Sequence, residues 1–138
     1  MLIKLIKVNI ITFLLIFFIF TKIIYAHEIN KDEARSILND LNIEYSVDAI
    51  CEAADKDDVK IIELFHLSGV SLDTECSIYG TTLLFNAVDR GSERVFRYLI
   101  DNGADINNFS KLSYKTVFIE ALSNSRYDWA YELLNLGV

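Results

Sequence analysis

Residues 80–88, Gly-Thr-Thr-Leu-Leu-Phe-Asn-Ala-Val, and residues 98–107, Tyr-Leu-Ile-Asp-Asn-Gly-Ala-Asp-Ile-Asn, decide the fold of this chain. In the first stretch Thr82 can cap a helix through its hydroxyl, and the apolar residues after it recur at helical spacing. In the second stretch Gly103 stands where a helix needs a left-handed residue in order to end. Each stretch therefore predicts a short helix, and the second helix leads into an extended loop.

The same pattern recurs with a period of 34 residues. Two sets of aligned positions define this period: Ala53, Ala87 and Ala121, and Gly69, Gly103 and Gly137. A fixed period of this length is typical of proteins in which each unit buries its apolar face against the next. We therefore predict an all-α solenoid of helix-turn-helix units within residues 43–138, with copies at about 45–76, 78–108 and 112–138.

These copies resemble the ankyrin repeat, whose pattern is G-x-T-P-L-H-x-A-A, then G, then L-L-x-x-G-A-D-x-N. The resemblance is carried by residues 80–88, Gly91 and residues 98–107, and it covers about residues 43–138. The chain departs from the family at the proline and histidine positions, which hold Ala49 and Cys51, Leu83 and Phe85, and Val117 and Ile119. The Thr–His hydrogen bonds that tie each turn to its helix are therefore absent, and we expect a less regular stack of modest stability.

Residues 27–42 precede the first copy and predict a single capping helix. Asn30 and Glu33 fit a capping box, in which each side chain bonds the backbone of the other. Apolar residues follow on one helical face: Ala34, Ile37, Leu38 and Leu41. We expect this helix to cover the open end of the first repeat, since an isolated repeat cannot bury its own face.

Residues 1–26 have the layout of a secretory signal peptide. Lys4 and Lys7 precede an apolar run over residues 8–21, and Ala26 supplies a small residue at the cleavage point before His27. The sequence thus predicts export to the periplasm or the exterior. An uncleaved signal anchor is the alternative, because a stretch of about 25 residues is long enough to span a bilayer.

Charge excludes two classes of partner. The chain of 138 residues carries a net charge of −7, but three of its 13 basic residues lie in residues 1–26, where there is no acid. Residues 27–138 therefore hold 10 basic and 20 acidic residues, a net charge of −10. Nucleic-acid binding and docking on anionic lipid both need a basic surface. We expect neither, and contact with a membrane only if the N-terminal segment is uncleaved.

The sequence offers little for catalysis. Glycine-rich phosphate loops, G-x-S-x-G elbows and H-E-x-x-H motifs are missing, and there are only two histidines and two cysteines. Asp55, Asp57 and Asp58 lack the spacing and the glycine of a calcium loop, so we interpret them as a solvated turn. His66 stands at an apolar position, which predicts a core or half-buried histidine. We expect no catalytic residue, no cofactor and no metal, and hence no enzyme.

Cys51 and Cys76 would meet an oxidising compartment after export. Cys51 belongs to the first helix of the first copy, and Cys76 to the loop that follows that copy. The loop could return to the helix, but a bridge requires Cα atoms within about 7 Å. The sequence therefore leaves open a disulfide or two free thiols.

The ankyrin resemblance implies a concave binding face made of loop tips and the exposed edges of the first helices. Carried over position by position, it selects Tyr79, Asn86, Asp89, Arg90, Phe109, Tyr114 and Glu120. The expected partner is another protein, of basic character, and the mechanism is non-catalytic binding. An immunity protein that neutralises a periplasmic toxin and a membrane-anchored adaptor are the alternative functions.

Overall fold

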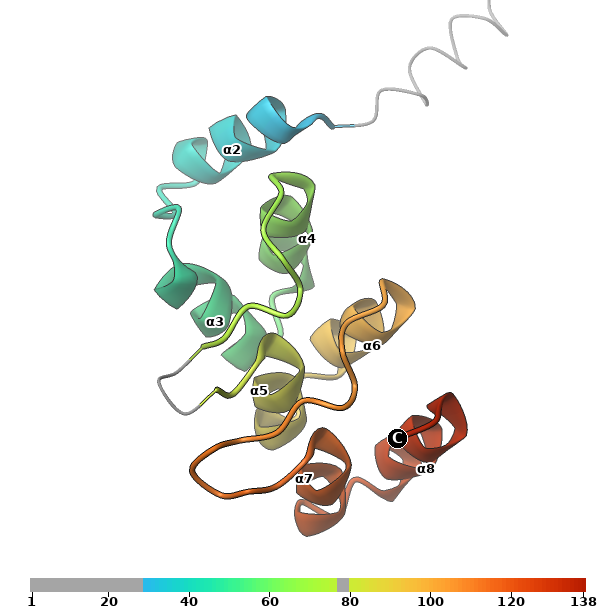
Figure 1. Ribbon diagram of the computed structural model, residues 1–138. Coiled ribbons are helices and arrows are strands. Elements are labelled where there is room, and N and C mark those ends of the chain that lie inside the picture. Colours follow the sequence, from blue (N-terminus) through green and yellow to red (C-terminus); the bar gives the residue numbers. More distant parts are fainter. Residues whose placement is uncertain (1–28, 77–79) are drawn as a thin grey trace, which may run out of the picture.

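The computed structural model describes residues 29–76 and 80–138, so the predicted signal segment lies outside the described residues. The described residues form seven helices and no strands, so the all-α prediction is confirmed. Figure 1 shows how these helices are arranged. These helices are α2 (Lys31–Asp40), α3 (Val47–Asp55), α4 (Val59–Leu67), α5 (Leu83–Arg90), α6 (Glu93–Asp101), α7 (Val117–Ser123) and α8 (Tyr127–Leu136). Within this part of the chain, none is both long and apolar enough to cross a bilayer.

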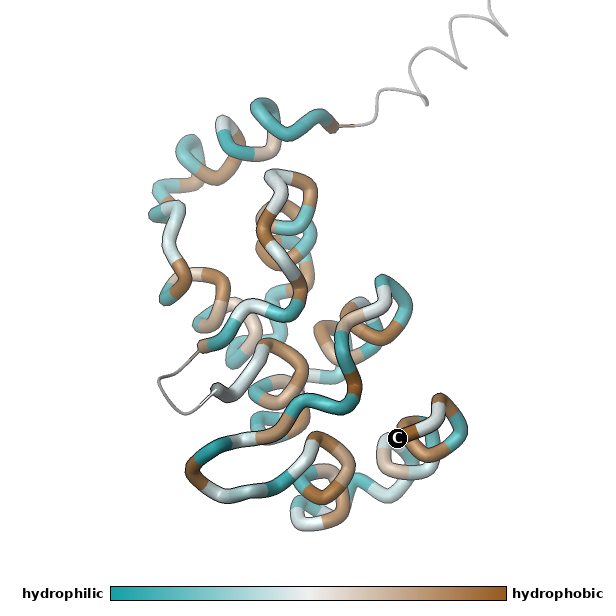
Figure 2. Tube along the Cα trace, viewed as in Figure 1, coloured by the Kyte–Doolittle hydropathy of each residue, from teal (hydrophilic) through white to brown (hydrophobic). Residues whose placement is uncertain are grey.

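The helices form two layers. The inner helices α3, α5 and α7 pack on one another in chain order, and α2, α4 and α6 do the same in the outer layer. The pairs α3–α4, α5–α6 and α7–α8 join the layers and define three helix-turn-helix units. Hydrophobic and hydrophilic residues alternate along every helix (Figure 2), because each helix has one face in the core and another in solvent.

Side chains at the helix N-termini explain where most helices begin. In five helices the N-cap side chain accepts a hydrogen bond from a backbone N–H of the first turn, which satisfies a donor that the helix itself leaves unpaired. The caps are Asn30, Ser46, Asp58, Thr82 and Thr116. Helices α6 and α8 have no such bond from their own N-caps.

Left-handed residues follow the same 34-residue period. Gly103, with φ of 78°, directly follows the C-cap of α6 as predicted, and Gly69 and Gly137 have φ of 95° and 99°. Between the two helices of each unit stand Asp57, Gly91 and Ser125, with φ of 57°, 81° and 57°. The period therefore fixes the backbone turns as well as the helices.

The core runs continuously through the three units. Phe65, Phe96 and Leu133 lie on α4, α6 and α8 and are at most 1% exposed. Phe96 also stacks on Trp129 of the next unit, with ring centroids 4.4 Å apart. At the N-terminal end, Ala34 and Leu38 of α2 are buried as predicted, whereas Leu41 is 55% exposed.

Candidate protein-binding surface

Two hairpin loops, the first finger and the second finger, connect consecutive units. The first is closed by an antiparallel bridge between Glu75 and Thr82, the second by one between Phe109 and Thr116. In the second finger Ser110 N donates to Lys115 O over 3.0 Å, and Tyr114 N donates to Ser110 O over 2.8 Å. Figure 1 shows the second finger projecting from the stack next to α5 and α7. Its backbone is thus held by its own hydrogen bonds.

The second finger exposes three apolar side chains. Phe109 is 47% exposed, Leu112 65% and Tyr114 83%. Sequence reasoning selected the two aromatic residues but missed Leu112, although an apolar residue between Lys111 and Ser113 in a loop was a visible signal. Tyr79, the candidate on the first finger, lies outside the described residues.

The edges of α3 and α5 carry a polar cluster that spans two units. Asn86 Nδ2 donates to Asp55 Oδ1 over 3.1 Å. Arg90 Nε lies 3.8 Å from Asp55 Oδ2 and 3.6 Å from Asp89 Oδ2. The charged side chains remain 37–59% exposed, so the structure brings three predicted site residues, Asn86, Asp89 and Arg90, together at the surface.

Glu120 is placed differently from the prediction. It is only 7% exposed, because Lys115 of the second finger pairs with its Oε2 at 3.0 Å and Asn124 Nδ2 donates to its Oε1 over 2.9 Å. Glu120 therefore holds the second finger against α7 and presents little surface to a partner.

The acidic turn after α3 is also more structured than expected. Asp57 Oδ1 accepts from Val95 N over 2.9 Å, and its Oδ2 pairs with Arg94 Nε at 3.0 Å. The prediction of a solvated turn was wrong for Asp57, whose side chain is 29% exposed, because the next unit places a helix N-terminus against it. Across the described residues, no group of three or more His, Cys, Asp and Glu could hold a metal.

Further contacts between units fix their relative positions. Asp73 Oδ1 accepts from Asp105 N over 2.7 Å, so the loops that end successive units are tied together. Arg126 Nε donates to Val88 O over 2.7 Å, at the end of α5. His66 is half-buried as predicted, and its Nδ1 lies 2.9 Å from the Tyr98 hydroxyl of the next unit. Together these contacts tie each repeat to the next.

Comparison with known families agrees with this geometry. A family model for ankyrin repeats in three copies matches residues 50–138, more than half of the chain. The chain belongs to the ankyrin-repeat family. Ankyrin repeats are generally non-catalytic modules that bind other proteins. No curated protein matches the sequence.

A disulfide joins Cys51 of α3 to Cys76 at the base of the first finger, with Cα atoms 5.5 Å apart. Cys51 stands where the ankyrin pattern has its histidine, and it is 8% exposed. In this protein the covalent bond therefore ties the first finger to its inner helix, the connection that hydrogen bonds make in family members with the Thr–His pair.

Proposed function

We propose that this protein is an exported, non-catalytic ankyrin-repeat protein that binds another protein through its second finger and the adjoining edges of α3 and α5. The observation that carries the proposal is the conformation of Tyr114. Its φ of +54° is left-handed, and the equivalent residue of the first finger is Gly80, with φ of +73°. A left-handed conformation costs a non-glycine residue about 1–2 kcal/mol.

Burial of the Tyr114 side chain does not offset this cost. The side chain is 83% exposed and buries too little apolar surface to offset a left-handed backbone. A partner that covered the ring would supply the missing burial, and tyrosine is among the residues that dominate binding energy at interfaces. Phe109 and Leu112 on the same finger enlarge the apolar patch to three side chains.

The rigidity of the finger favours binding. Lys115 is held by Glu120, and the finger backbone is closed by its own hydrogen bonds, so little conformational entropy is lost when a partner binds. The net charge of −10 over residues 27–138 would steer a basic partner toward the protein. A periplasmic toxin is one class of such partner, and the protein would then act as its immunity protein.

Two observations support export. The N-terminal residues have the pattern of a signal peptide, and Cys51 is bonded to Cys76. Disulfides persist in oxidising compartments and are rare in the cytosol. Mass spectrometry of the N-terminus tests the route: a mature chain that starts at His27 supports cleavage, and one that starts at Met1 supports the membrane-anchored adaptor.

Affinity capture from the periplasmic fraction tests the binding surface. The wild-type protein should retain a reproducible partner, and Tyr114→Gly should retain at least about tenfold less of it, the loss typical of an interface anchor. Ser125→Gly is the matched control, because it makes the same change at another left-handed residue, with φ of 57°, away from the fingers. Equal capture by the wild type and Tyr114→Gly, or no reproducible partner, would contradict the proposed function.

A further inference from the structure

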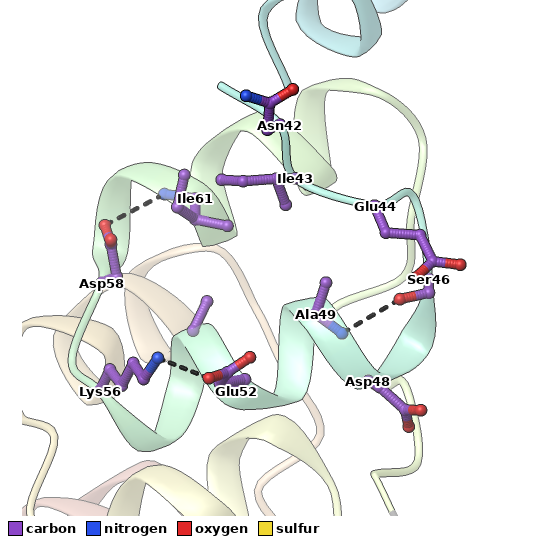
Figure 3. Close-up of a pocket in the computed structure, with 11 residues that line it drawn as sticks. Asn42, Ile43, Glu44, Ser46, Asp48, Ala49, Glu52, Lys56, Asp58 and Ile61 are labelled. Atoms are coloured by element: carbon purple, nitrogen blue, oxygen red, sulfur yellow. Dashed lines mark hydrogen bonds and ion pairs between the residues drawn. The ribbon is translucent and has the colours of Figure 1, made fainter. Parts of the chain in front are cut away.

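A recess of about 360 Å³ opens at the N-terminal end of the stack (Figure 3). It is formed by the link between α2 and α3, by one face of α3 and by the start of α4. We call it the end socket, and its main lining residues are Ile43, Glu44, Asp48, Ala49, Glu52 and Ile61.

The end socket lies where an inner helix of a preceding repeat would pack. In the outer layer α2 covers α4, but within residues 29–76 and 80–138 no inner helix precedes α3. One period after Ala49 and Ile61 stand Leu83 and Val95, and both are 0% exposed because a preceding unit covers them. Ala49 and Ile61 remain partly exposed. Among the residues that the structure describes, this end of the stack is thus covered in the outer layer and uncovered in the inner layer.

The margin of the end socket is acidic. Glu44, Asp48 and Glu52 belong to its lining, and Lys56 is the only basic residue of that lining. Figure 3 shows Glu44 and Asp48 at the outer edge, with their carboxylates turned away from Ala49 and Ile61. Lys56 forms an ion pair with Glu52, which lies one helical turn before it. Glu44 and Asp48 have no ion-pair partner in the described part of the chain, and both side chains are exposed. Two carboxylates are therefore available to an incoming cation.

We propose that the end socket binds a helix of the partner protein, with small apolar residues against Ala49 and Ile61 and with Lys or Arg side chains on its flanks beside Glu44 and Asp48. This inference rests on the proposed function, because it assigns a second contact and a chemistry to the same partner. A helix fits the shape because the socket is the vacant position of a repeat's inner helix. Basic flanks fit the charge, since opposite charges across an interface favour association.

Charge also argues against a second copy of this chain as the occupant. Head-to-tail stacking of two copies would bring α7 and α8 of one copy against the end socket of the next. These two helices contain no Lys or Arg, and Asp128 of α8 is exposed. A second copy would therefore bring Asp128, and no basic residue of these helices, to the acidic margin of the socket, and this pairing disfavours the contact.

A pair of synthetic helical peptides tests the proposal. Each has 14 residues with a Leu/Ala face; one carries Lys on both flanks, and the other carries Glu at the same positions. Fluorescence anisotropy is measured with protein purified from cells that express the full chain. We expect the Lys peptide to bind at least about tenfold more tightly, and Glu44→Gln with Asp48→Asn to weaken it about fivefold, as expected for two exposed ion pairs.

Matched variants make the test specific. Ala49→Arg should abolish peptide binding, because it fills the floor of the socket and adds a positive charge. Glu93→Gln with Asp101→Asn removes the same charge from exposed positions of α6 and should leave binding unchanged. Equal weakening by the two charge-removing pairs, or equal binding of the Lys and Glu peptides, would overturn the proposal. Circular dichroism verifies that each variant is folded.

Other occupants give distinct results. If the purified protein excludes the peptide and residues 20–28 crosslink to position 49, the chain's own N-terminal segment fills the socket and the proposal is overturned. Concentration-dependent dimers that disappear in Glu44→Gln with Asp48→Asn would show a second copy there and would also overturn it. Partner capture that depends on Tyr114 would survive either result, so failure of the end socket is distinguishable from failure of the proposed function.

Discussion

Asp57 Oδ1 accepts a hydrogen bond from the backbone N–H of Val95 over 2.9 Å, although the two residues belong to different repeats. Ser92, the N-cap of α6, makes no side-chain capping bond, so Asp57 supplies the acceptor that the helix's own N-cap does not. Arg94 Nε pairs with the second carboxylate oxygen at 3.0 Å. A side chain of the first repeat therefore caps the N-terminus of a helix in the second repeat.

Replacing Asp57 should loosen this junction. Asp57→Ala removes the capping acceptor and the partner of Arg94 and keeps a Cβ at φ of +57°, so we expect a loss of about 2 kcal/mol in the free energy of unfolding. Asp57→Gly keeps the left-handed backbone and should lose about 1 kcal/mol. Urea unfolding measures both. Asp101→Ala, an exposed acid at the end of α6, is the control, and an equal effect there would contradict the assignment.

The sequence predicts the turn at Gly103 but does not predict the contact made by Asp57. The left-handed turn at Gly103 depends on local residues and on the period, so the sequence predicts it. The bond from Asp57 to Val95 joins residues 38 apart and depends on how the repeats are staggered, which a hydrophobic period does not determine. The repeat period predicts the helices and turns of a solenoid. The polar contacts between repeats depend instead on how the repeats pack against one another.

The candidate binding surface also contains residues that the sequence could predict and one that it could not. Phe109 and Tyr114 could be selected from their position on the finger, but Glu120 could not be known to be buried. Its burial results from the path of the second finger, which places Lys115 over α7. Loop paths depend on hydrogen bonds such as Ser110 to Lys115 that leave no regular pattern in the sequence.

The disulfide should make a large contribution to stability. It closes a loop of 25 residues and so restricts the unfolded chain, by about 3 kcal/mol for a loop of this size. Cys51→Ser with Cys76→Ser should lower the free energy of unfolding by about that amount. Thermal unfolding of the wild type should shift to lower temperature in dithiothreitol, and the double variant should not respond. A thiol assay that finds two free cysteines in protein taken from the periplasm would contradict the bond.

Tyr45 and Tyr98 should ionise at different pH. The hydroxyl of Ser68, 3.0 Å away, lowers the pKa of Tyr45 below 10.0, and Arg35 adds to the effect. Burial raises the pKa of Tyr98 above 10.0, and the carboxylate of Glu63 raises it further. Ultraviolet titration should therefore lose a tyrosinate signal from below pH 10.0 in Tyr45→Phe and one from above pH 10.0 in Tyr98→Phe. The reverse order would contradict both environments.

The raised pKa of Tyr98 also sets a stability trend. The folded protein favours the neutral phenol, so the stability that Tyr98 contributes is present below pH 10.0 and is lost as the pH rises through its folded pKa. Urea midpoints should fall more steeply above pH 10.0 in the wild type than in Tyr98→Phe. His66→Phe, which removes the partner of the Tyr98 hydroxyl at 2.9 Å, separates the hydrogen bond from burial, because only the burial effect persists in it.

Tyr114→Gly should raise the stability of the free protein while it weakens partner binding. Relief of the left-handed strain is worth about 1–2 kcal/mol, and the greater flexibility of glycine in the unfolded chain cancels about 0.5–1 kcal/mol of it. The net gain is about 0.5–1 kcal/mol, since little burial is lost from a side chain that is 83% exposed. Tyr131→Gly supplies the opposite sign: that tyrosine is 68% exposed within α8, where glycine costs about 1 kcal/mol. Urea unfolding of both variants measures these changes. A loss of stability in Tyr114→Gly would show that the tyrosine ring stabilises the folded protein. It would therefore contradict the assignment of Tyr114 to partner binding.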